Sequence, residues 1–273
     1  IISGSRLLNF EHGKGQYLQL EDAYLNYHWP TKKIEIPTPH GVRVIDRLAS
    51  LNANEVLLDE LSSNLIRVIN QGSEDELAGW VEAILRWGGV YTLSNGTKGN
   101  AGWLNGYRST GGLRDYLKST ISYLESTDDD AVGDLIADLR SNAGLTKIYS
   151  MACANFVIYD SRVAAALTWL LSKWSGEAEL VPENLRFAAM RANTSKKAGK
   201  LRTANPKIFP YFSPSGSRSN HVKHLMWNIR ANWVLEEALI QAQKNQGGAI
   251  GSMRALEASL FVLGDDLSFA TRY

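Results

Sequence analysis

The sequence predicts an all-α fold in the main, with few or no strands. Two observations support this prediction: from residue 41 onward apolar residues recur at spacings of three and four, and alternation of apolar and polar residues is nearly absent. The 273 residues, 44% of them hydrophobic, suffice for a core of their own. We therefore expect one compact helical domain over 1–273, which could divide into two helical lobes, about 41–180 and 1–40 plus 181–273.

The N-terminal part is expected to begin irregularly and then to become helical. A short helix near 18–27 and an extended segment come first, and any short strands are expected here. Helical spacing of apolar residues follows from 41 onward. Ser73 precedes three acidic residues, which is the pattern of an N-cap with a capping box, so a helix is expected to start there and to end at Gly88-Gly89.

A glycine-rich stretch and a series of helices complete the chain. Six of the 19 residues in 94–112 are Gly, which predicts a long loop or a series of turns, and such loops are often functional. Asp128-Asp129-Asp130 offer N-caps for a following helix. Apolar periodicity predicts helices at about 113–124, 131–141, 145–155, 162–174, 219–245 and 252–263. Only Asn142-Ala143-Gly144 separate two of them, which indicates a helix-hairpin-helix element.

Positive charge is concentrated in one part of the chain. The formal net charge is only +1, yet the 52 residues from Asn184 to Leu235 contain ten Lys and Arg and no Asp or Glu. The rest of the chain therefore holds 19 basic side chains against 28 acidic ones. A basic stretch of this kind is typical of proteins that bind a polyanion. We expect double-stranded DNA as the partner, with phosphate contacts that release counterions.

Composition excludes several classes of protein. Cys153 is the single cysteine, so an intrachain disulfide, a cysteine-based zinc site and an iron–sulfur cluster are excluded. No apolar run approaches the roughly 20 residues that span a bilayer, and no signal-peptide pattern is visible. We expect a monomer of the cytoplasm, associated with the nucleoid through DNA, without cofactor or metal. His221 and His224 are spaced as a metal pair, but a phosphate-facing or solvated role is favoured.

We expect the segment 132–171 to contain the candidate phosphate-binding turn and the candidate catalytic residue. A tight turn between two helices presents backbone N–H groups that suit a phosphate. Asp160 opens the next helix, so it is a candidate N-cap as well as a candidate catalytic carboxylate. The run Leu145-Thr146-Lys147-Ile148-Tyr149-Ser150-Met151-Ala152, followed by Phe156-Val157-Ile158-Tyr159-Asp160-Ser161-Arg162-Val163, resembles the helix-hairpin-helix DNA glycosylase superfamily. Residues 254–264 resemble a closing helix of distant members.

The resemblance implies a hydrolase acting on N-glycosyl bonds. Asp160 would be the catalytic carboxylate that stabilises the oxocarbenium-like sugar and activates water. Lys147 falls near the Schiff-base lysine of the members that also act as lyases, although its separation from Asp160 is shorter than usual. The hairpin has Gly144 alone where the family has a Gly-x-Gly core. The base must leave the stack and enter a pocket before its bond is cleaved.

Further residues are assigned by type and position. The residues expected to contact DNA are Asn142, Gly144, Thr146, Arg162, Lys196, Lys197, Lys200, Arg202 and Arg218. The aromatic residues expected to form the base pocket, or the wedge that fills the space left by the base, are Trp103, Tyr107, Tyr27 and Trp29. Each of these aromatic residues could instead be a core residue.

Several functions remain open at this stage. The substrate could be an oxidised or alkylated base in DNA repair, or a bulky modified phage cytosine such as glucosylated hydroxymethylcytosine in anti-phage defence. A non-catalytic DNA-binding module and a helical protein with an acidic protein partner are the alternatives. No P-loop, dinucleotide-binding, HExxH or GxSxG pattern supports a kinase, dehydrogenase, metalloprotease or esterase.

Overall fold

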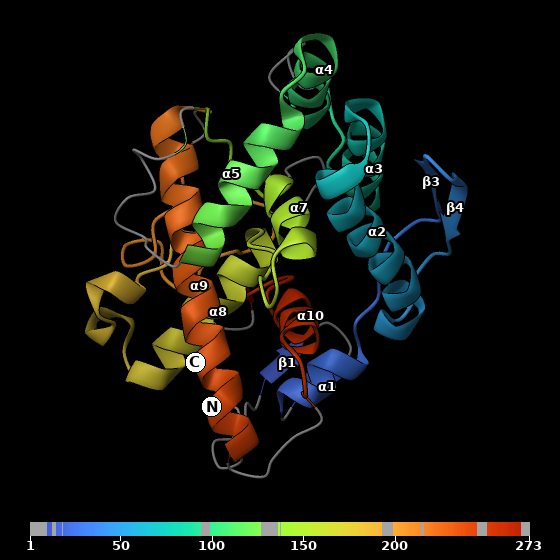
Figure 1. The fold of residues 1–273 in the computed structure, drawn as a ribbon. Helices are drawn as coiled ribbons and strands as arrows, with labels where there is room; N and C mark the ends of the chain where they lie inside the picture. Colours follow the sequence, from blue (N-terminus) through green and yellow to red (C-terminus); the bar gives the residue numbers. More distant parts are fainter. Residues whose placement is uncertain are drawn as a thin grey trace. The chain divides into compact units, whose positions relative to one another are not determined.

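The described structure is mainly helical, as the apolar spacing predicted. In this computed structural model, the residues described are 10–12, 15–17, 19–93, 99–126, 136, 138–192, 199–213, 216–244 and 250–268. The α-helices in this part of the chain are α1 (Leu20–Leu25), α2 (Leu51–Gln71), α3 (Glu74–Trp87), α4 (Asn100–Thr110), α5 (Leu113–Ser126), α7 (Leu145–Ala152), α8 (Ser161–Ser175), α9 (Arg218–Lys244) and α10 (Met253–Leu263) (Figure 1). None of them has the length and apolar character needed to cross a membrane.

Two small antiparallel hairpins accompany the helices. Strands β1 (Phe10–His12) and β2 (Gly15–Tyr17) form one pair, and β3 (Ile34–Thr38) and β4 (Gly41–Ile45) form the other. In the second pair Ile34 lies opposite Ile45 and Thr38 opposite Gly41. Gly41 has a φ of +108°, which a residue with a Cβ rarely adopts, so the tight connection needs glycine there.

The chain divides into two compact units. The first unit contains Ile1–Tyr27, Val157–Ser215 and Trp227–Tyr273, and the second contains His28–Phe156 and Gly216–Met226. Helix α9 thus contributes its first residues to the second unit and the remainder to the first. The sequence suggested lobes that change near residues 40 and 180. The units change at 27/28, 156/157, 215/216 and 226/227, and the second of these lies shortly before Asp160.

The first unit is built around α8 and α10. Helix α10 packs against both α1 and α8, and α8 also contacts the short 3-10 helix η1 (Ala178–Leu180). Helix α8 has nine buried residues in succession, from Val163 to Leu171, and all of them except Thr168 are apolar. A second 3-10 turn, η2 (Glu183–Leu185), follows η1. Buried Phe187 and Phe209 complete this core, so the first turn of α8 is anchored on a well-packed helix.

The second unit is built around α3. This helix contacts α2, α4, α5, α7 and strand β3. Its N-cap is Ser73, whose hydroxyl oxygen accepts a hydrogen bond from the Glu76 amide at 3.1 Å, which confirms the helix start expected from the sequence. Trp80, Ile84 and other side chains of α3 are fully buried, because its apolar positions fall on most of its circumference.

Three sequence-based expectations about secondary structure are wrong. Residues 41–45 form β4 rather than a helix, and the side chains of Val44 and Leu48, which suggested helical spacing, are largely exposed. Residues 100–110 form helix α4 rather than a loop, and Asn100, Ala101 and Leu104 supply its buried face. Residues 138–141 are not helical, although a helix was expected up to 141. Residues 94–98 and 127–135, including the Asp128-Asp129-Asp130 caps, lie outside the described residues.

Candidate functional site

Asp160 lies at the N-terminus of α8, as the sequence predicted. Its Oδ1 atom accepts hydrogen bonds from the backbone N–H groups of Arg162 at 2.8 Å and Val163 at 3.1 Å. Both N–H groups belong to the first turn, so the carboxylate also lies at the positive end of the helix dipole. Among the described residues, Oδ2 has no hydrogen-bond partner. The capping role therefore occupies one oxygen and leaves the other available for chemistry.

The backbone just before this carboxylate is held by side chains from α9 and α10. The amide of Val157 donates to Asn232 Oδ1 at 2.8 Å, and its carbonyl accepts from Asn228 Nδ2 at 3.0 Å. The next amide, that of Ile158, donates to Glu257 Oε2 at 2.7 Å. All three side chains are buried. These bonds satisfy an extended segment that has no strand partner, and they fix the position from which α8 begins.

Glu257 is a second carboxylate near Asp160 that sequence reasoning missed. Its side chain is only 8% exposed, and Oε1 accepts a hydrogen bond from Arg254 Nη1 at 3.0 Å. Burial raises the pKa of Glu257, the charge of Asp160 raises it further, and Arg254 opposes both. Its position within an apolar helical run, with Arg254 three residues before it, was the signal available in the sequence.

Tyr27 lies in the same unit as Asp160, close enough for its ionisation to respond to these charges. Burial raises the pKa of Tyr27 well above its ordinary value, and the charges of Glu257 and Asp160 add to the effect. The Tyr27 ring packs against Phe261 with ring centroids 5.5 Å apart. Only 7% of Tyr27 is exposed, so its phenol remains protonated and can act only as a neutral hydrogen-bonding group.

Asp265 forms ion pairs with three cationic side chains that the sequence predicted to contact DNA. Arg162 Nε lies 3.0 Å and Arg202 Nη2 3.3 Å from Asp265 Oδ1, and Lys200 Nζ pairs with Oδ2. Burial alone would raise the pKa of Asp265, but Arg162, Lys200 and Arg202 together lower it. Arg202 is only 4% exposed and also donates a hydrogen bond to the Gly264 carbonyl oxygen, so its guanidinium stabilises the folded chain. Asp265 lies outside the stretch from Asn184 to Leu235, which contains no Asp or Glu.

Arg162 remains partly exposed beside Asp160. Its guanidinium stacks over the Phe261 ring at 4.0 Å, which holds it in place while its edge pairs with Asp265. It does not form an ion pair with Asp160 among the described contacts. Lys196 and Lys197, which were also predicted to contact DNA, lie outside the described residues.

In the second unit, the tight turn before α7 caps that helix. Asn142 Oδ1 accepts from the amides of Gly144 at 2.8 Å and Leu145 at 3.1 Å, and its carbonyl oxygen accepts from the Thr146 amide. Asn142 Nδ2 donates to Asn100 Oδ1 at 3.0 Å. Gly144 and Thr146 are buried. The N–H groups that were expected to bind phosphate are therefore satisfied within the protein.

The proximity of Asn100 explains the glycine in this turn. A Cβ at Gly144 would lie 2.1 Å from Asn100 Nδ2, so a larger residue would displace the side chain that supports Asn142. The requirement comes from close packing with α4, because the φ of Gly144 is −80°. The single glycine of the turn is thus explained without a ligand.

Lys147 lies on α7 and is buried. Its side chain is only 6% exposed, and Nζ donates a hydrogen bond to the Ala143 carbonyl oxygen at 2.9 Å. The aliphatic stem packs on Gly88, where an added Cβ would lie 2.2 Å from Lys147 Cδ. The amine is therefore held against its own helix start and not presented as a solvated side chain.

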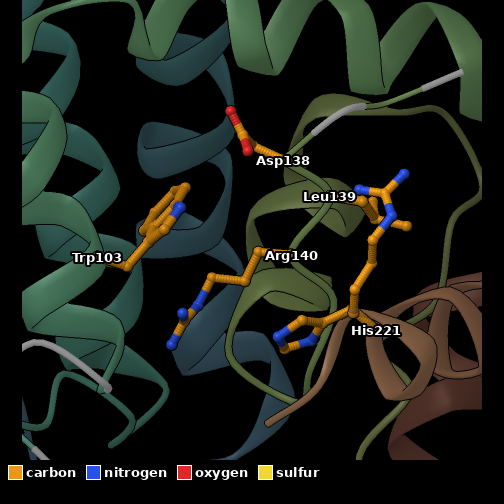
Figure 2. Close-up of a pocket in the computed structure, with 6 residues that line it drawn as sticks. Trp103, Asp138, Leu139, Arg140 and His221 are labelled. Atoms are coloured by element: carbon orange, nitrogen blue, oxygen red, sulfur yellow. The ribbon is translucent and has the colours of Figure 1, made fainter.

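The described part of the second unit also has an open pocket of about 300 Å³ (Figure 2). It is lined by Trp103, Asp138, Leu139, Arg140, Arg218 and His221. Figure 2 shows Trp103 on one side, His221 on another and Arg140 between them. Trp103 and Arg218 were among the residues predicted to contact the base and DNA, and a phosphate-facing or solvated role was favoured for His221. Asp138 and Arg140 were missed as site residues.

Aromatic residues support one wall of this pocket. Trp103 meets Tyr107 and Tyr116 edge to face, with centroids 5.3 Å and 5.7 Å away. Burial, with the charges of Tyr116 and Asp138, raises the pKa of Tyr107 to about 12. These residues lie on helices α4 and α5, so the flat wall is rigid, in contrast to the loop that was expected here.

His221 is oriented by a backbone contact. Its Nδ1 lies 2.7 Å from the Ser141 carbonyl oxygen, which can only accept, so Nδ1 carries the proton. Burial lowers the pKa of His221 and Arg140 lowers it further, while the bond to Ser141 partly offsets them. His224 instead bonds through Nδ1 to the Ser141 hydroxyl. Within the described residues, no group of His, Cys, Asp and Glu could hold a metal ion.

Trp29, the last of the four aromatic residues predicted to contact the base, is tied into the second unit. Its Nε1 donates to the Trp87 carbonyl oxygen at 3.0 Å, and its own carbonyl oxygen accepts from Asn54 Nδ2 at 2.9 Å. Both contacts join the segment before β3 to helices α2 and α3. They give Trp29 a packing role in this unit.

The structure therefore presents two centres, each within one unit. The first is the carboxylate of Asp160 with Glu257, Tyr27 and the cations around Asp265. The second is the pocket beside Trp103. No protein-family model matches the chain, and neither a curated protein nor a solved structure is significantly similar to it.

Proposed function

We propose that the chain is a DNA glycosylase that flips a modified or damaged base out of the duplex and hydrolyses its N-glycosidic bond. The observation that carries the proposal is the carboxylate of Asp160, which is held through Oδ1 by the first turn of α8 while Oδ2 has no hydrogen-bond partner among the described residues. A rigid carboxylate with one available oxygen is what stabilisation of a cationic sugar requires.

The reaction follows from that geometry. The bond between C1′ and the base nitrogen breaks, and its electron pair leaves with the base, which takes up a proton from solvent. Positive charge develops on the sugar, and the negative charge of Asp160 stabilises it. The oxygen of a water molecule bonds to C1′, and its proton passes to Asp160 Oδ2 or to solvent. The products are the free base and an abasic site.

The surroundings of Asp160 differ from those of Glu257. Two backbone N–H groups donate to Oδ1, and a helix N-terminus favours negative charge. Glu257, by contrast, is buried and has a raised pKa. Two carboxyl groups in different environments can divide their roles. In this proposal Asp160 carries the charge, while Glu257 positions the backbone that precedes it.

The order of elements from α7 to α8 supports this proposal. A short helix, α7, is followed by an extended segment and then by α8 with Asp160 as its N-cap. The proposed DNA contacts are the cations with exposed or partly exposed side chains, Arg162, Lys200 and Arg218, together with Lys196 and Lys197 from outside the described residues. Arg202 is left out because it is buried.

We expect hydrolysis without lyase chemistry. A Schiff base at Lys147 would need its amine to leave the Ala143 carbonyl oxygen and reach C1′ from a side chain that is only 6% exposed. Incubation with substrate DNA and borohydride should therefore give no covalent complex on a denaturing gel. A trapped complex that disappears in Lys147→Gln would instead assign Lys147 as the nucleophile.

The substrate is tested by offering several DNAs in parallel. Phage DNA with glucosylated hydroxymethylcytosine, oxidised DNA, alkylated DNA and unmodified DNA should be incubated with the protein, and abasic sites counted after cleavage with alkali. We expect abasic sites with one modified DNA and none with unmodified DNA. An anti-phage role is supported by the glucosylated substrate, and a repair role by an oxidised or alkylated one.

A non-catalytic DNA-binding module is the second candidate function. It is favoured by the pocket cations Arg140 and Arg218, which need no carboxylate chemistry to bind DNA. This function predicts duplex binding that weakens steeply with salt, in the absence of abasic sites on every DNA offered.

A further inference from the structure

The pocket beside Trp103 has a ligand chemistry of its own. We propose that it binds a single unpaired nucleotide, with the base against Trp103 and the phosphate at Arg218. This goes beyond the proposed function, since binding of a nucleotide here requires neither Asp160 nor cleavage of a bond. The pocket residues all belong to the second unit, whereas Asp160 belongs to the first.

The wall of the pocket suits a flat ring. Trp103 is half-buried, and the edge-to-face contacts with Tyr107 and Tyr116 fix the plane of its indole. Every nucleobase has a π face that can stack on such a ring. The volume of about 300 Å³ lies at the lower end of the range for small-molecule sites, which fits one nucleotide rather than a longer strand.

The cations suit the phosphate. Arg218 is exposed at the start of α9, and Arg140 is half-buried. Arginine offers paired donors that match the oxygens of a phosphate. Arg218, the exposed arginine of the pocket, can therefore bind the phosphate of a nucleotide.

The remaining polar groups suit the edge of a base. Because Nδ1 of His221 carries the proton, the neutral imidazole has Nε2 as an acceptor, and Asp138 adds a carboxylate acceptor. Figure 2 shows Asp138 at one end of the pocket and His221 toward the other. A carboxylate accepts from an exocyclic amino group, as it does from cytosine N4. The pocket should thus prefer bases with an amino group over thymine.

Calorimetric titration with mononucleotides tests this assignment. Deoxycytidine 5′-monophosphate should bind saturably with one site per chain, while thymidine 5′-monophosphate, deoxycytidine and inorganic phosphate should each bind more weakly. An oligonucleotide with one unpaired cytosine in a duplex, compared with the fully paired duplex, distinguishes a nucleotide in DNA from a free one. Equal dissociation constants for deoxycytidine 5′-monophosphate and inorganic phosphate would reduce the site to an anion site and overturn the proposal.

Variants with matched controls locate the binding. Arg218→Ala alters an exposed side chain and should weaken binding about tenfold, since it removes a charged hydrogen bond. Trp103→Leu should weaken it at least fivefold through the lost stacking. The controls are Lys223→Ala, an exposed cation of the same helix, and Trp174→Leu, an exposed tryptophan of the other unit. If the controls weaken binding as much as the pocket variants, the proposal fails.

Failure of the nucleotide-binding proposal can be distinguished from failure of the proposed glycosylase function. Asp160→Asn should bind deoxycytidine 5′-monophosphate as the wild type does. A wild-type chain that binds the nucleotide yet forms no abasic site on any DNA would overturn the glycosylase and support the nucleotide site. A chain that forms abasic sites but binds no mononucleotide would overturn the nucleotide site alone.

Discussion

Replacing Asp160 with Asn should abolish most base release while leaving the protein folded. Asparagine caps helices about as well as aspartate, so the bonds to the Arg162 and Val163 amides persist. The charge that stabilises the sugar cation is lost, and removal of one preorganised electrostatic group costs about 10²- to 10³-fold in rate. Single-turnover release of the base checks the loss of activity, and a thermal melt of the same variant checks that the fold is retained.

Asp266→Asn is a matched control for this variant. Asp266 is also a carboxylate of the first unit that accepts two backbone N–H groups through one oxygen, those of Leu201 and Ser268, both at 3.1 Å. Asp266→Asn removes one negative charge and keeps an oxygen that accepts backbone N–H groups, as Asp160→Asn does, but at another position. It should leave the rate of base release close to that of the wild type. Equal losses in both variants would mean that overall charge, and not Asp160, is responsible.

Gly264→Ala should have the largest effect on stability. A Cβ at this position would lie 1.8 Å from the Arg162 carbonyl oxygen and 2.9 Å from the Ala166 amide nitrogen. These are backbone atoms of α8, which cannot rotate away, so the end of α10 must move from the first turn of α8. We expect a loss of about 3 kcal/mol. In a chain of this size the midpoint of thermal unfolding would fall by about 6–12 °C.

The same substitution should reduce activity beyond its effect on stability. Asp265 follows Gly264 directly and pairs with Arg162, so movement of this segment disturbs the turn that carries Asp160. Gly251→Ala is the control, because a Cβ there meets nothing within 4 Å. Thermal melts and base release of the two variants should be compared at a temperature where both are folded. Equal melting points for the two variants would contradict this account of the α8–α10 contact.

Helices whose ends carry local signals were predictable from the sequence. Ser73 and Asp160 are N-caps in the structure as expected, and the ends of α8, α9 and α10 lie within one residue of the predicted ones. Caps and apolar spacing act over a few residues, so a single sequence contains their signal. The mainly helical fold followed from the same observations.

Elements that depend on distant partners were not predictable. Helix α4 contains Gly102 and Gly106, which disfavour a helix, but burial of Ala101 and Leu104 outweighs this propensity. Strand β4 is stabilised by its pairing with β3. The alternation of apolar and polar residues in β3 is too short to be recognised in the sequence beside the helical spacing of Val44 and Leu48. In both cases tertiary packing decides against local preference.

The candidate site was predictable only in part. Asp160 was identified because a helix start has a recognisable pattern. Glu257 and Asp265 act on its surroundings from about 100 residues away, and their partners could be found only in three dimensions. Arg202 shows the opposite case: its place in the acid-free stretch suggested a DNA contact, whereas Asp265 and Gly264 bind it within the core.

Release of a free base from modified duplex DNA is the measurement that tests the central claim most directly. The wild-type chain and Asp160→Asn should be incubated with the same DNA, and the released base identified by mass spectrometry. We predict a free base and an equal amount of abasic sites with the wild type, and at most about a hundredth of that rate with Asp160→Asn. Equal release by both chains, or salt-sensitive binding of every modified DNA without any released base, would contradict it.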